Sequence, residues 1–571
     1  MKENSVLSWL GKTTKRYQRF VVLLIALEML VSGLGVCYAL VMKRMVDKAV
    51  AKDSHGFVLG MCGFGLLVIS QLSIRIITRQ VSEFTRSSVE NTLKKKLFDS
   101  ILRKDYGSVN ATHSEEWMNR LTSDTAICAN GMTDIVPGFL GMMIRLVGSF
   151  ALIFWLQPQL AFIIIPGGIV FLLLTVVIRK PIKRFHKKVQ EKDGSVRVYL
   201  QERISSMLVV RTFGVEDIAI EKAADKMEIH RAARMQKAWI SNICNSGFSL
   251  AINGMYLLGM GYCGYGIIKG VVSFGTLTAI IQLMGQLQSP LSSLGGYVPR
   301  YYTTIASAER LMEVEQFEDV DVKELCPKNQ VKTLYESKIK EFTFDHVSFQ
   351  YGKETDTGIA KNVLNDVSFR IQKGDYVAIT GTSGCGKSTM LKLLMGVYQP
   401  QSGTVHVNFT DGTSIPIENM KRLFAYVPQG NFLMGGSIRD VITFGQYEPG
   451  NEPKIKAALR VACGDFVYGL PMELDTILGE KGAGLSEGQM QRIAIARAIY
   501  ADCPVLVLDE STSALDERIQ QELLENLKQL TDKTVLLVSH RLKALSICNR
   551  HLHFEDGNVQ SGMELKDIDF N

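Results

Sequence analysis

The ten cysteines of this chain include no C-x-x-C pair, and this absence limits what the protein can be. Four of them lie in strongly apolar segments (Cys37, Cys62, Cys244 and Cys263), and the others are scattered through polar ones. Zinc sites and disulfide frameworks need closely spaced or regularly paired cysteines, so we expect buried free thiols instead. A small-residue cleavage site is also lacking after the first apolar run, which argues against a removed signal peptide.

Long apolar runs are absent from the second half of the chain and frequent in the first. A helix needs roughly 20 mostly apolar residues to cross a bilayer. Six runs in one half are incompatible with the core of a soluble protein, so we predict an α-helical membrane domain with six transmembrane helices. The predicted spans are Val21–Met42, Phe57–Ile77, Ile135–Leu156, Leu160–Ile178, Ile243–Ile268 and Phe274–Leu294.

The basic residues predict how the spans are oriented. The connections Thr78–Asp134 and Arg179–Asn242 are long and rich in Lys and Arg, whereas Gln157–Gln159 carries no charge. Basic loops stay in the cytosol, so we place the two long connections, the N-terminus and the second half of the chain there. This bias accounts for the net charge of +7, and nothing points to nucleic acid as a partner.

The composition changes again near the middle of the chain. We predict a transmembrane domain with cytosolic coupling loops over residues 1–312, a polar linker over 313–338 and a soluble domain over 339–571. In the last of these, short apolar runs alternate with helical stretches, which is typical of an α/β domain with a mainly parallel sheet. The strand-like runs are Val363–Ile371, Tyr376–Ile379, Phe424–Val427, Val505–Leu508 and Thr534–Val538.

The sequence GTSGCGKST at Gly381–Thr389 matches the phosphate-binding pattern G-x-x-x-x-G-K-[ST] and lies between a predicted strand and a predicted helix. Glycines let backbone N–H groups turn towards a phosphate, and the following helix N-terminus favours negative charge. Lys387 can reach the outer phosphates and Ser388 can ligate Mg²⁺. We therefore predict that ATP or GTP binds along the whole loop, which consists of Gly381, Thr382, Ser383, Gly384, Cys385, Gly386, Lys387, Ser388 and Thr389.

Two further motifs follow the phosphate loop along the chain. The first is LSEGQ at Leu485–Gln489, and the second is VLVLDE at Val505–Glu510. With the six spans and the phosphate loop, they make the chain similar to a half-transporter of the ATP-binding-cassette (ABC) superfamily, of the six-span exporter type. The resemblance covers essentially the whole length. It implies a P-loop ATPase coupled to transmembrane transport, with ATP and Mg²⁺ as cofactors.

The resemblance also implies roles for single residues. Asp509, Ser388 and Gln429 would hold Mg²⁺, and Lys387 would bind the outer phosphates. Glu510 would orient or deprotonate the attacking water, and Gln429 would join Mg²⁺ and this water to the contact with the membrane domain. His540 would contact the γ-phosphate. Tyr351 would stack on adenine, Ser486, Gly488 and Gln489 would contact the nucleotide, and Glu480 would touch the membrane domain. One departure stands out: Glu487 replaces a glycine of the family signature, and we expect its carboxylate to point away from the phosphates because it would repel them.

One chain carries one phosphate loop and one signature helix, and the resemblance implies that each ATP lies between the loop of one copy and the signature of another. A homodimer is the simplest assembly, and a heterodimer is the alternative. The segments Asn119–Asp124 and Val209–Asp217 resemble the cytosolic turns that couple the two kinds of domain. Within the spans, Glu28 and Arg145 are expected either to pair or to line a cavity, because charges in a bilayer are costly.

These features predict an exporter in a bacterial inner or plasma membrane that moves an amphiphilic cargo, such as a lipid-linked molecule, a drug or a small peptide. Two alternatives stay open. An exporter-shaped protein can import, for example a siderophore, and a nucleotide-gated channel or sensor needs ATP only for gating. Glu510 argues against gating alone, because a channel or sensor does not need a hydrolytic base.

Overall fold

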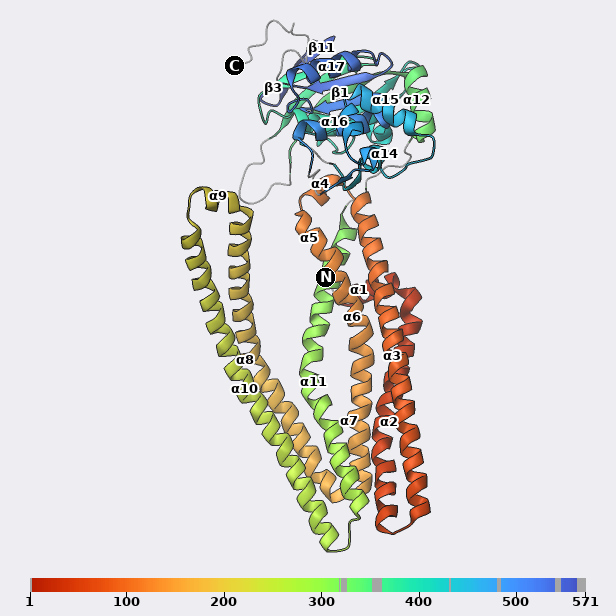
Figure 1. Ribbon diagram of the computed structural model, residues 1–571, viewed down its shortest axis with the longest axis vertical. Helices are drawn as coiled ribbons and strands as arrows, with labels where there is room; N and C mark the ends of the chain where they lie inside the picture. The colour runs from red at the N-terminus through yellow and green to blue at the C-terminus, as the bar shows by residue number, and fades with distance from the viewer. Residues whose placement is uncertain are drawn as a thin grey trace. The chain divides into compact units, whose positions relative to one another are not determined.

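The computed structural model describes residues 3–317, 319, 326–351, 362–430, 433–479, 484–539 and 546–561. It forms two compact units (Figure 1). The first, here called the helical unit, comprises Met1–Leu102 and Ser114–Gln316. The second, called the sheet unit, comprises Arg103–His113 and Phe317–Asn571.

The six predicted spans coincide with six long helices of the helical unit. These are α2 (Gln18–Val50), α3 (Ser54–Arg103), α7 (Val136–Leu156), α8 (Pro158–Ser205), α10 (Glu216–Ile268) and α11 (Phe274–Glu313). Among the described residues, three helical stretches are long and apolar enough to cross a membrane, namely Lys15–Val50, Ser54–Arg103 and Ser114–Leu156. Several helices are longer than a bilayer requires, as expected for spans that continue as helices beyond it.

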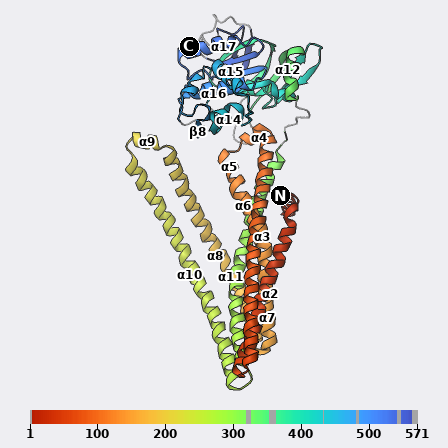
Figure 2. The ribbon, with the colours of Figure 1, turned by 45° about the vertical axis from the view of Figure 1, so that its right-hand side comes forward.

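Shorter helices connect these long ones. They are α1 (Glu3–Thr13), α4 (Tyr106–Asn110), α5 (Ser114–Asn119), α6 (Thr125–Asn130) and α9 (Met207–Thr212), with π-helical turns η2 (Arg120–Asp124) and η3 (Gly131–Ile135). Helices α8 and α10 lie side by side along their length and diverge from the other helices towards α9 (Figures 1 and 2). At the opposite end of the unit, a buried apolar cluster that includes Ile153, Ile280 and Leu283 joins α7, α10 and α11. The long helices therefore pack together at one end of the unit, and α8 and α10 separate from the others towards the opposite end.

The sheet unit contains two main sheets. The larger has the strand order β12-β11-β3-β10-β9-β6, in which β12 is antiparallel to β11 and the other neighbours are parallel. Its strands are β3 (Tyr376–Gly381), β6 (Phe424–Val427), β9 (Val505–Asp509), β10 (Thr534–Val538), β11 (Arg550–Glu555) and β12 (Asn558–Ser561). This confirms the predicted α/β domain with a mainly parallel sheet.

The second sheet is antiparallel, with the order β2-β1-β4-β5. Its strands are β1 (Ile339–Phe349), β2 (Leu364–Gln372), β4 (Ser402–Phe409) and β5 (Ser414–Pro416), and a small pair is formed by β7 (Gly436–Ser437) and β8 (Ile477–Leu478). Of these, only β2 was predicted. The other strands alternate polar and apolar residues or are very short, so they contain no continuous apolar run.

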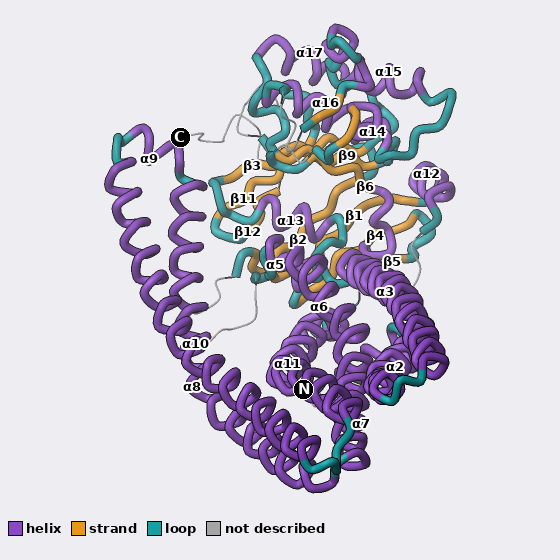
Figure 3. Tube along the Cα trace, turned by 60° about the horizontal axis from the view of Figure 1, so that its bottom comes forward, coloured by secondary structure: helices purple, strands orange, loops and turns teal. Residues whose placement is uncertain are grey.

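Helices cover both faces of the larger sheet (Figure 3). They are α12 (Lys328–Ser337), α13 (Lys387–Leu394), α14 (Ile438–Thr443), α15 (Glu452–Val461), α16 (Glu487–Tyr500) and α17 (Glu517–Lys528). In β9, Val505 and Val507 join the core shared with α13 and the antiparallel sheet, while Leu506 and Leu508 join the core beneath α14–α17. Successive residues of a strand face opposite sides, so an all-apolar strand is buried on both.

Helix α12 lies within the segment expected to be a linker. Its Val331 and Tyr335 are buried in the core of the sheet unit, and the Tyr335 hydroxyl lies 2.7 Å from the hydroxyl of Thr534 in β10. Few side chains of this polar helix face inward, so its apolar residues were too sparse to predict a packed element. Helix α12 is therefore part of the folded sheet unit.

Candidate nucleotide site

The carboxyl ends of four neighbouring parallel strands meet at one edge of the larger sheet. In the register of the strands, Val538 pairs with both Ile379 and Asp509, and Val427 pairs with Leu508. Loops that leave this edge carry the predicted phosphate loop, the two carboxylates and Gln429. Ligands of α/β sheets bind at such an edge.

The phosphate loop connects β3 to α13 with a backbone that requires glycine. Gly381 has φ +138°, and a Cβ there would lie 2.2 Å from the carbonyl oxygen of Phe554. The ammonium group of Lys387 donates hydrogen bonds to the carbonyl oxygens of Gly381 (2.7 Å) and Thr382 (2.8 Å). Thr382, Ser383 and Gly384 are exposed, whereas Cys385 is buried. The loop is thus closed around its own lysine and presents its first residues to solvent.

Tyr351 lies against the first turn of α13. Its hydroxyl is 2.8 Å from the hydroxyl of Thr389, and its ring contacts those of Phe349 and Tyr398 edge-on, with centroids 5.1 and 5.5 Å away. The side chain is 46% exposed although three neighbours hold it. A fixed, half-exposed ring beside the loop is suited to stacking on a base.

Asp509 is the last residue of β9 and is almost fully buried. The Tyr426 hydroxyl donates a hydrogen bond to its Oδ2 (3.1 Å), while Oδ1 is buried with no hydrogen-bond partner among the described residues. Burial raises the pKa of this carboxyl above its usual value, and the nearby hydroxyl groups of Ser388 and Tyr426 act in the opposite direction. A buried carboxylate oxygen without a partner, beside a hydroxyl, fits Mg²⁺, which prefers such hard oxygen ligands.

Glu510 follows directly, with a left-handed backbone (φ +48°) that turns the chain away from the strand. Its N–H donates to the carbonyl oxygen of Val538 (3.1 Å), which fixes this turn on β10. Gln429, in the loop after β6, donates from Nε2 to Oε2 of Glu510 (2.6 Å). Two residues that are far apart in sequence and were predicted to act on the same water are therefore in direct contact.

The LSEGQ motif forms the N-terminus of α16. Ser486 caps the helix, because its hydroxyl accepts from the N–H of Gln489 (3.3 Å) and the Gln489 side chain accepts from the N–H of Ser486 (2.8 Å). Glu487 is the first helical residue, and its side chain is exposed. At Gly488, a Cβ would lie 2.8 Å from the carbonyl oxygen of Ala514, so glycine allows α16 to approach the loop after Glu510.

Two side chains of the site were not singled out from the sequence. Tyr426 reaches Asp509, and Gln491 accepts a hydrogen bond from the N–H of Ala514 (3.2 Å), tying α16 to the loop after Glu510. Tyr426 precedes Gln429 by three residues in AYVPQ, which is the only signal that could have identified it. His540 and Glu480 lie outside the described residues.

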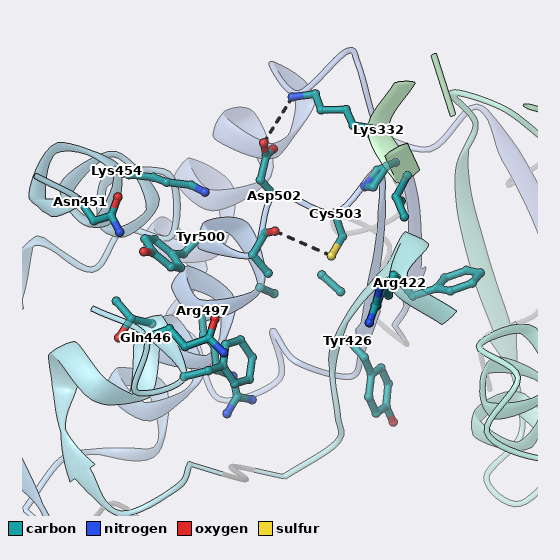
Figure 4. Close-up of a pocket in the computed structure, with 18 of the residues that line it drawn as sticks. Lys332, Arg422, Tyr426, Gln446, Asn451, Lys454, Arg497, Tyr500, Asp502 and Cys503 are labelled. Atoms are coloured by element: carbon teal, nitrogen blue, oxygen red, sulfur yellow. Dashed lines mark hydrogen bonds and ion pairs between the residues drawn. The ribbon is translucent and has the colours of Figure 1, made fainter. Parts of the chain in front are cut away.

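A separate cavity of about 740 Å³ lies in the sheet unit between β6, α14 and the end of α16 (Figure 4). Lys332 and Asp502 form an ion pair at its border (3.3 Å), and Arg497 and Tyr500 belong to its wall. The predicted nucleotide residues are not among those that line it. Tyr426, however, both borders the cavity and donates to Asp509, so it links the two sites.

In the first cytosolic connection, the residues that pack with the sheet unit are not those predicted to couple the two kinds of domain. Asn119–Asp124 lies in the continuous helical path of α5, η2 and α6, where Asp124 is buried and bonded to Arg310 of α11 (2.8 Å). It is α4 that packs within the sheet unit, where Tyr106 meets the ring of Tyr398 (centroids 5.5 Å apart). Val209–Asp217 includes most of α9, whose side chains are largely exposed.

The expected pair of Glu28 and Arg145 is not formed. These residues lie in α2 and α7, and no ion pair or hydrogen bond joins them among the residues that the structure describes. Lysine and arginine pairs with acids occur elsewhere in the unit, for example between Arg86 and Asp134 (3.0 Å). Equal depth in two neighbouring spans was therefore insufficient to predict contact.

Comparisons with known proteins agree with this architecture. The family model described as the ABC transporter transmembrane region matches residues 21–291, and that described as ABC transporter matches residues 364–513. The ATP-dependent lipid A-core flippase of Desulfotalea psychrophila is 29% identical over 84% of this chain and 82% of its own. Antigen peptide transporter 2 of Mus musculus is 27% identical over 85% of this chain and 67% of its own.

A solved structure extends the likeness to the fold. The structure of a bacterial Atm1-family ABC exporter with ATP bound superposes with a TM-score of 0.76 at 22% sequence identity. The match covers 97% of this chain and 96% of that one, so both units and their order in the chain are shared.

Proposed function

This chain belongs to the ABC transporter family, and from that premise we propose that it is an ATP-driven exporter that moves an amphiphilic cargo out of the cytosol by alternating access. The flippase and the peptide transporter named above are both membrane transporters by their names, and they match both units of this chain. A lipid-linked molecule, a drug or a small peptide is the class of cargo we propose. The protein is multi-pass, and we place its N-terminus and sheet unit in the cytosol of a bacterial cell.

The observation that carries this proposal is the contact between Gln429 and Glu510 beside Asp509. Phosphoryl transfer needs a positioned water and neutralised charge more than it needs covalent chemistry. In our proposal Glu510 receives the proton of the attacking water, and Gln429 fixes the carboxylate that does so. Lys387 leaves the loop carbonyls for the β- and γ-phosphates, and Tyr351 stacks on the adenine.

Ser388, Gln429 and Asp509 are the residues proposed to hold Mg²⁺. When bound, the ion would neutralise charge on the phosphate oxygens during hydrolysis. The orphaned Oδ1 of Asp509 supports this assignment, because it lacks the partner that a buried carboxylate oxygen needs.

A second copy of the chain completes the site in this proposal. Among the described residues, no hydrogen bond or ion pair joins Ser486, Gly488 or Gln489 to the phosphate loop of the same chain. The side chains of Ser486 and Gln489 instead cap the first turn of α16. A signature helix from a partner would aim its N-terminus at the γ-phosphate. ATP then favours the closed dimer because it binds that state better, and hydrolysis releases it. The exposed α9 region is proposed to transmit closure to the spans.

The test replaces Glu510 with glutamine, which keeps the shape and removes the base. We expect ATP hydrolysis by purified protein to fall roughly 10²–10⁴-fold while ATP binding persists. Cargo uptake into inside-out vesicles should be lost together with hydrolysis. Cargo flux in Glu510→Gln that still responds to ATP would instead indicate a nucleotide-gated channel, and ATP-driven flux in the opposite direction would indicate an importer.

A further inference from the structure

The helical unit holds two charged side chains for which no ionic partner is found among the residues that the structure describes. Glu28 and Arg145 lie within the predicted spans, and neither forms an ion pair or hydrogen bond among the described residues. Both are partly shielded rather than exposed. An ionisable side chain at this depth is costly, and such groups usually face a partner, a cavity or a transport path.

Two glycines of α7 allow polar side chains of the neighbouring helices to lie directly against its backbone. At Gly141, a Cβ would approach the Cβ of Glu28 to 3.3 Å and the hydroxyl of Ser32 to 3.2 Å. At Gly138, it would approach the hydroxyl of Tyr297 in α11 to 2.7 Å. Residues 138, 141 and 145 are spaced i, i+3, i+7, so Arg145 shares the face of α7 that carries both glycines.

Tyr297 connects these groups electrostatically. Its hydroxyl is within the electrostatic range of Glu28, Arg145, Arg300 and Asp134. Asp134 already has a partner, because Arg86 donates to it at 3.0 Å. Arg300 is exposed, whereas Glu28 and Arg145 are partly shielded. This leaves one shielded carboxylate from α2 and one shielded guanidinium from α7 close enough to act on the phenol of α11.

A buried hydroxyl is also left without a partner at this place. Ser32 lies one helical turn after Glu28 and is 1% exposed, and its Oγ makes no hydrogen bond to the described part of the chain. Most buried polar groups are hydrogen-bonded, so an unpaired one indicates a missing ligand or water. We call the set of Glu28, Ser32, Arg145 and Tyr297 the polar chamber.

The same unit locks its helices elsewhere with completed pairs. Asp124 accepts from Arg310 Nε (2.8 Å) and from the hydroxyl of Ser307 (2.8 Å), which joins η2 to α11. Gln286 of α11 donates to the carbonyl oxygen of Gly35 in α2 (2.6 Å). The chamber contrasts with these contacts, because its two opposite charges both act on Tyr297 and, among the described residues, no hydrogen bond or ion pair joins them.

We propose that the polar chamber binds the head of the cargo, and that this head carries both an anionic group and an amino group. Arg145 receives the phosphate or carboxylate, Glu28 receives the ammonium, and the Tyr297 hydroxyl bonds to either. A guanidinium and a carboxylate each form their strongest hydrogen bonds with a group of opposite charge. This inference rests on the proposed export function and narrows its cargo to a zwitterionic amphiphile.

The test measures ATPase stimulation of the full-length protein in a neutral maltoside detergent. The probes carry a single acyl chain: lysophosphatidylethanolamine has both charges, lysophosphatidylglycerol has only the phosphate, and hexadecylamine has only the amine. An apolar peptide with free termini, compared with its doubly capped form, supplies the same two charges from another source. For each, the concentration giving half-maximal stimulation is determined relative to the protein's own basal rate.

For the unmodified protein we expect the two-charge probes to act at concentrations about tenfold lower than the one-charge probes, as for one well-formed charge contact. In Glu28→Gln, the two-charge lysolipid should no longer act at a lower concentration than lysophosphatidylglycerol. In Arg145→Gln, it should no longer act at a lower concentration than hexadecylamine. Tyr297→Phe, which retains the ring, should weaken both. Arg75→Gln, an exposed arginine of α3 outside the chamber, is the matched control and should change neither. Whether the lysolipid or the free peptide acts at the lower concentration identifies the source of the head.

The inference is overturned if the unmodified protein does not distinguish two-charge from one-charge probes. It is equally overturned if Glu28→Gln and Arg145→Gln shift all probes by the same factor, as loss of a structural contact would. Failure of the export proposal looks different: basal hydrolysis without any probe would be absent or unaffected by Glu510→Gln. The basal rate thus separates the two failures.

Discussion

Asp509 is predicted to cost stability in the protein without nucleotide. Burial raises the pKa of Asp509 above the usual 3.8. Its contribution to the stability of the folded state is therefore fully present below pH 3.8 and is lost as the pH rises through the pKa of the folded state. At neutral pH the charge is therefore buried at a cost, and Asp509→Asn should raise the Tm by about 2–4 °C for each kcal/mol relieved. The increase should shrink as the pH is lowered towards 3.8, and the variant should lose the stabilisation given by Mg·ATP. Thermal unfolding at several pH values measures both effects.

Asp502 provides a control of opposite sign. Burial alone would raise its pKa, but the hydrogen bond and charge of Lys533, helped by Lys332, lower it. Its stabilising contribution is thus present above the ordinary pKa and lost as the pH falls, so Asp502→Asn should lower the Tm at neutral pH. An equal change of the same sign in both variants would show that the buried charge of Asp509 is not the cause.

At the scale of single elements, α16 depends on a close approach that only glycine allows. In Gly488→Ala, the added methyl carbon would lie 2.8 Å from the Ala514 carbonyl oxygen, and overpacking of this kind costs about 1–3 kcal/mol. We expect a lower Tm and a lower kcat, because the loop that must shift begins just after Glu510. Gly469→Ala is the control, since nothing lies within 4 Å of its Cβ position. Similar losses in both variants would refute the packing argument.

Helix α4 gives a prediction about coupling. Tyr106→Ala removes the ring contact with Tyr398, and an aromatic pair of this kind is worth about 0.5–1.5 kcal/mol. We expect hydrolysis to persist and the number of cargo molecules moved per ATP to fall, measured together in reconstituted vesicles. Phe98→Ala, which removes an exposed aromatic from α3, should leave this ratio unchanged. A proportional loss of transport and hydrolysis would contradict the role of α4.

The same elements show what could be predicted from the sequence. Strands β3, β9 and β10 are buried on both faces, so each reads as an apolar run that a composition argument can find. Strand β1 has the sequence IKEFTFDHVSF and pairs with β2 and β4, and its partners, not its own pattern, determine that it is a strand. Helix α4 has five residues and could not be recognised as a packed element before its contacts with Tyr398 were known.

At the scale of the whole molecule, the order of the motifs predicted that two units share one chain. It did not predict which side chains contact each other. The phosphate loop, Asp509 and Glu510 were identified because a nucleotide site needs these residue types at strand ends. Glu28 and Arg145 were recognised as unusual for a membrane, but their arrangement depends on glycines in α7 and on Tyr297 of a distant helix. Local sequence identifies residue types at strand ends, but it does not show which residues from distant helices lie together.

The proposed dimer makes a prediction about which lesions can complement each other. If ATP lies between the loop of one copy and the signature helix of the other, Lys387→Ala and Ser486→Arg placed in different chains damage the same composite site. The other site then keeps both of its parts. When both changes are placed in one chain, each of the two sites contains one lesion.

Dimers with defined composition, isolated through two different affinity tags, measure this directly. We expect the dimer with one change in each chain to hydrolyse ATP at a rate well above that of the dimer whose changes share a chain. If each site were built within a single chain, the ranking would be reversed, because a doubly altered chain would leave its unaltered partner with an intact site. The order of the two rates therefore determines whether the nucleotide is shared between copies.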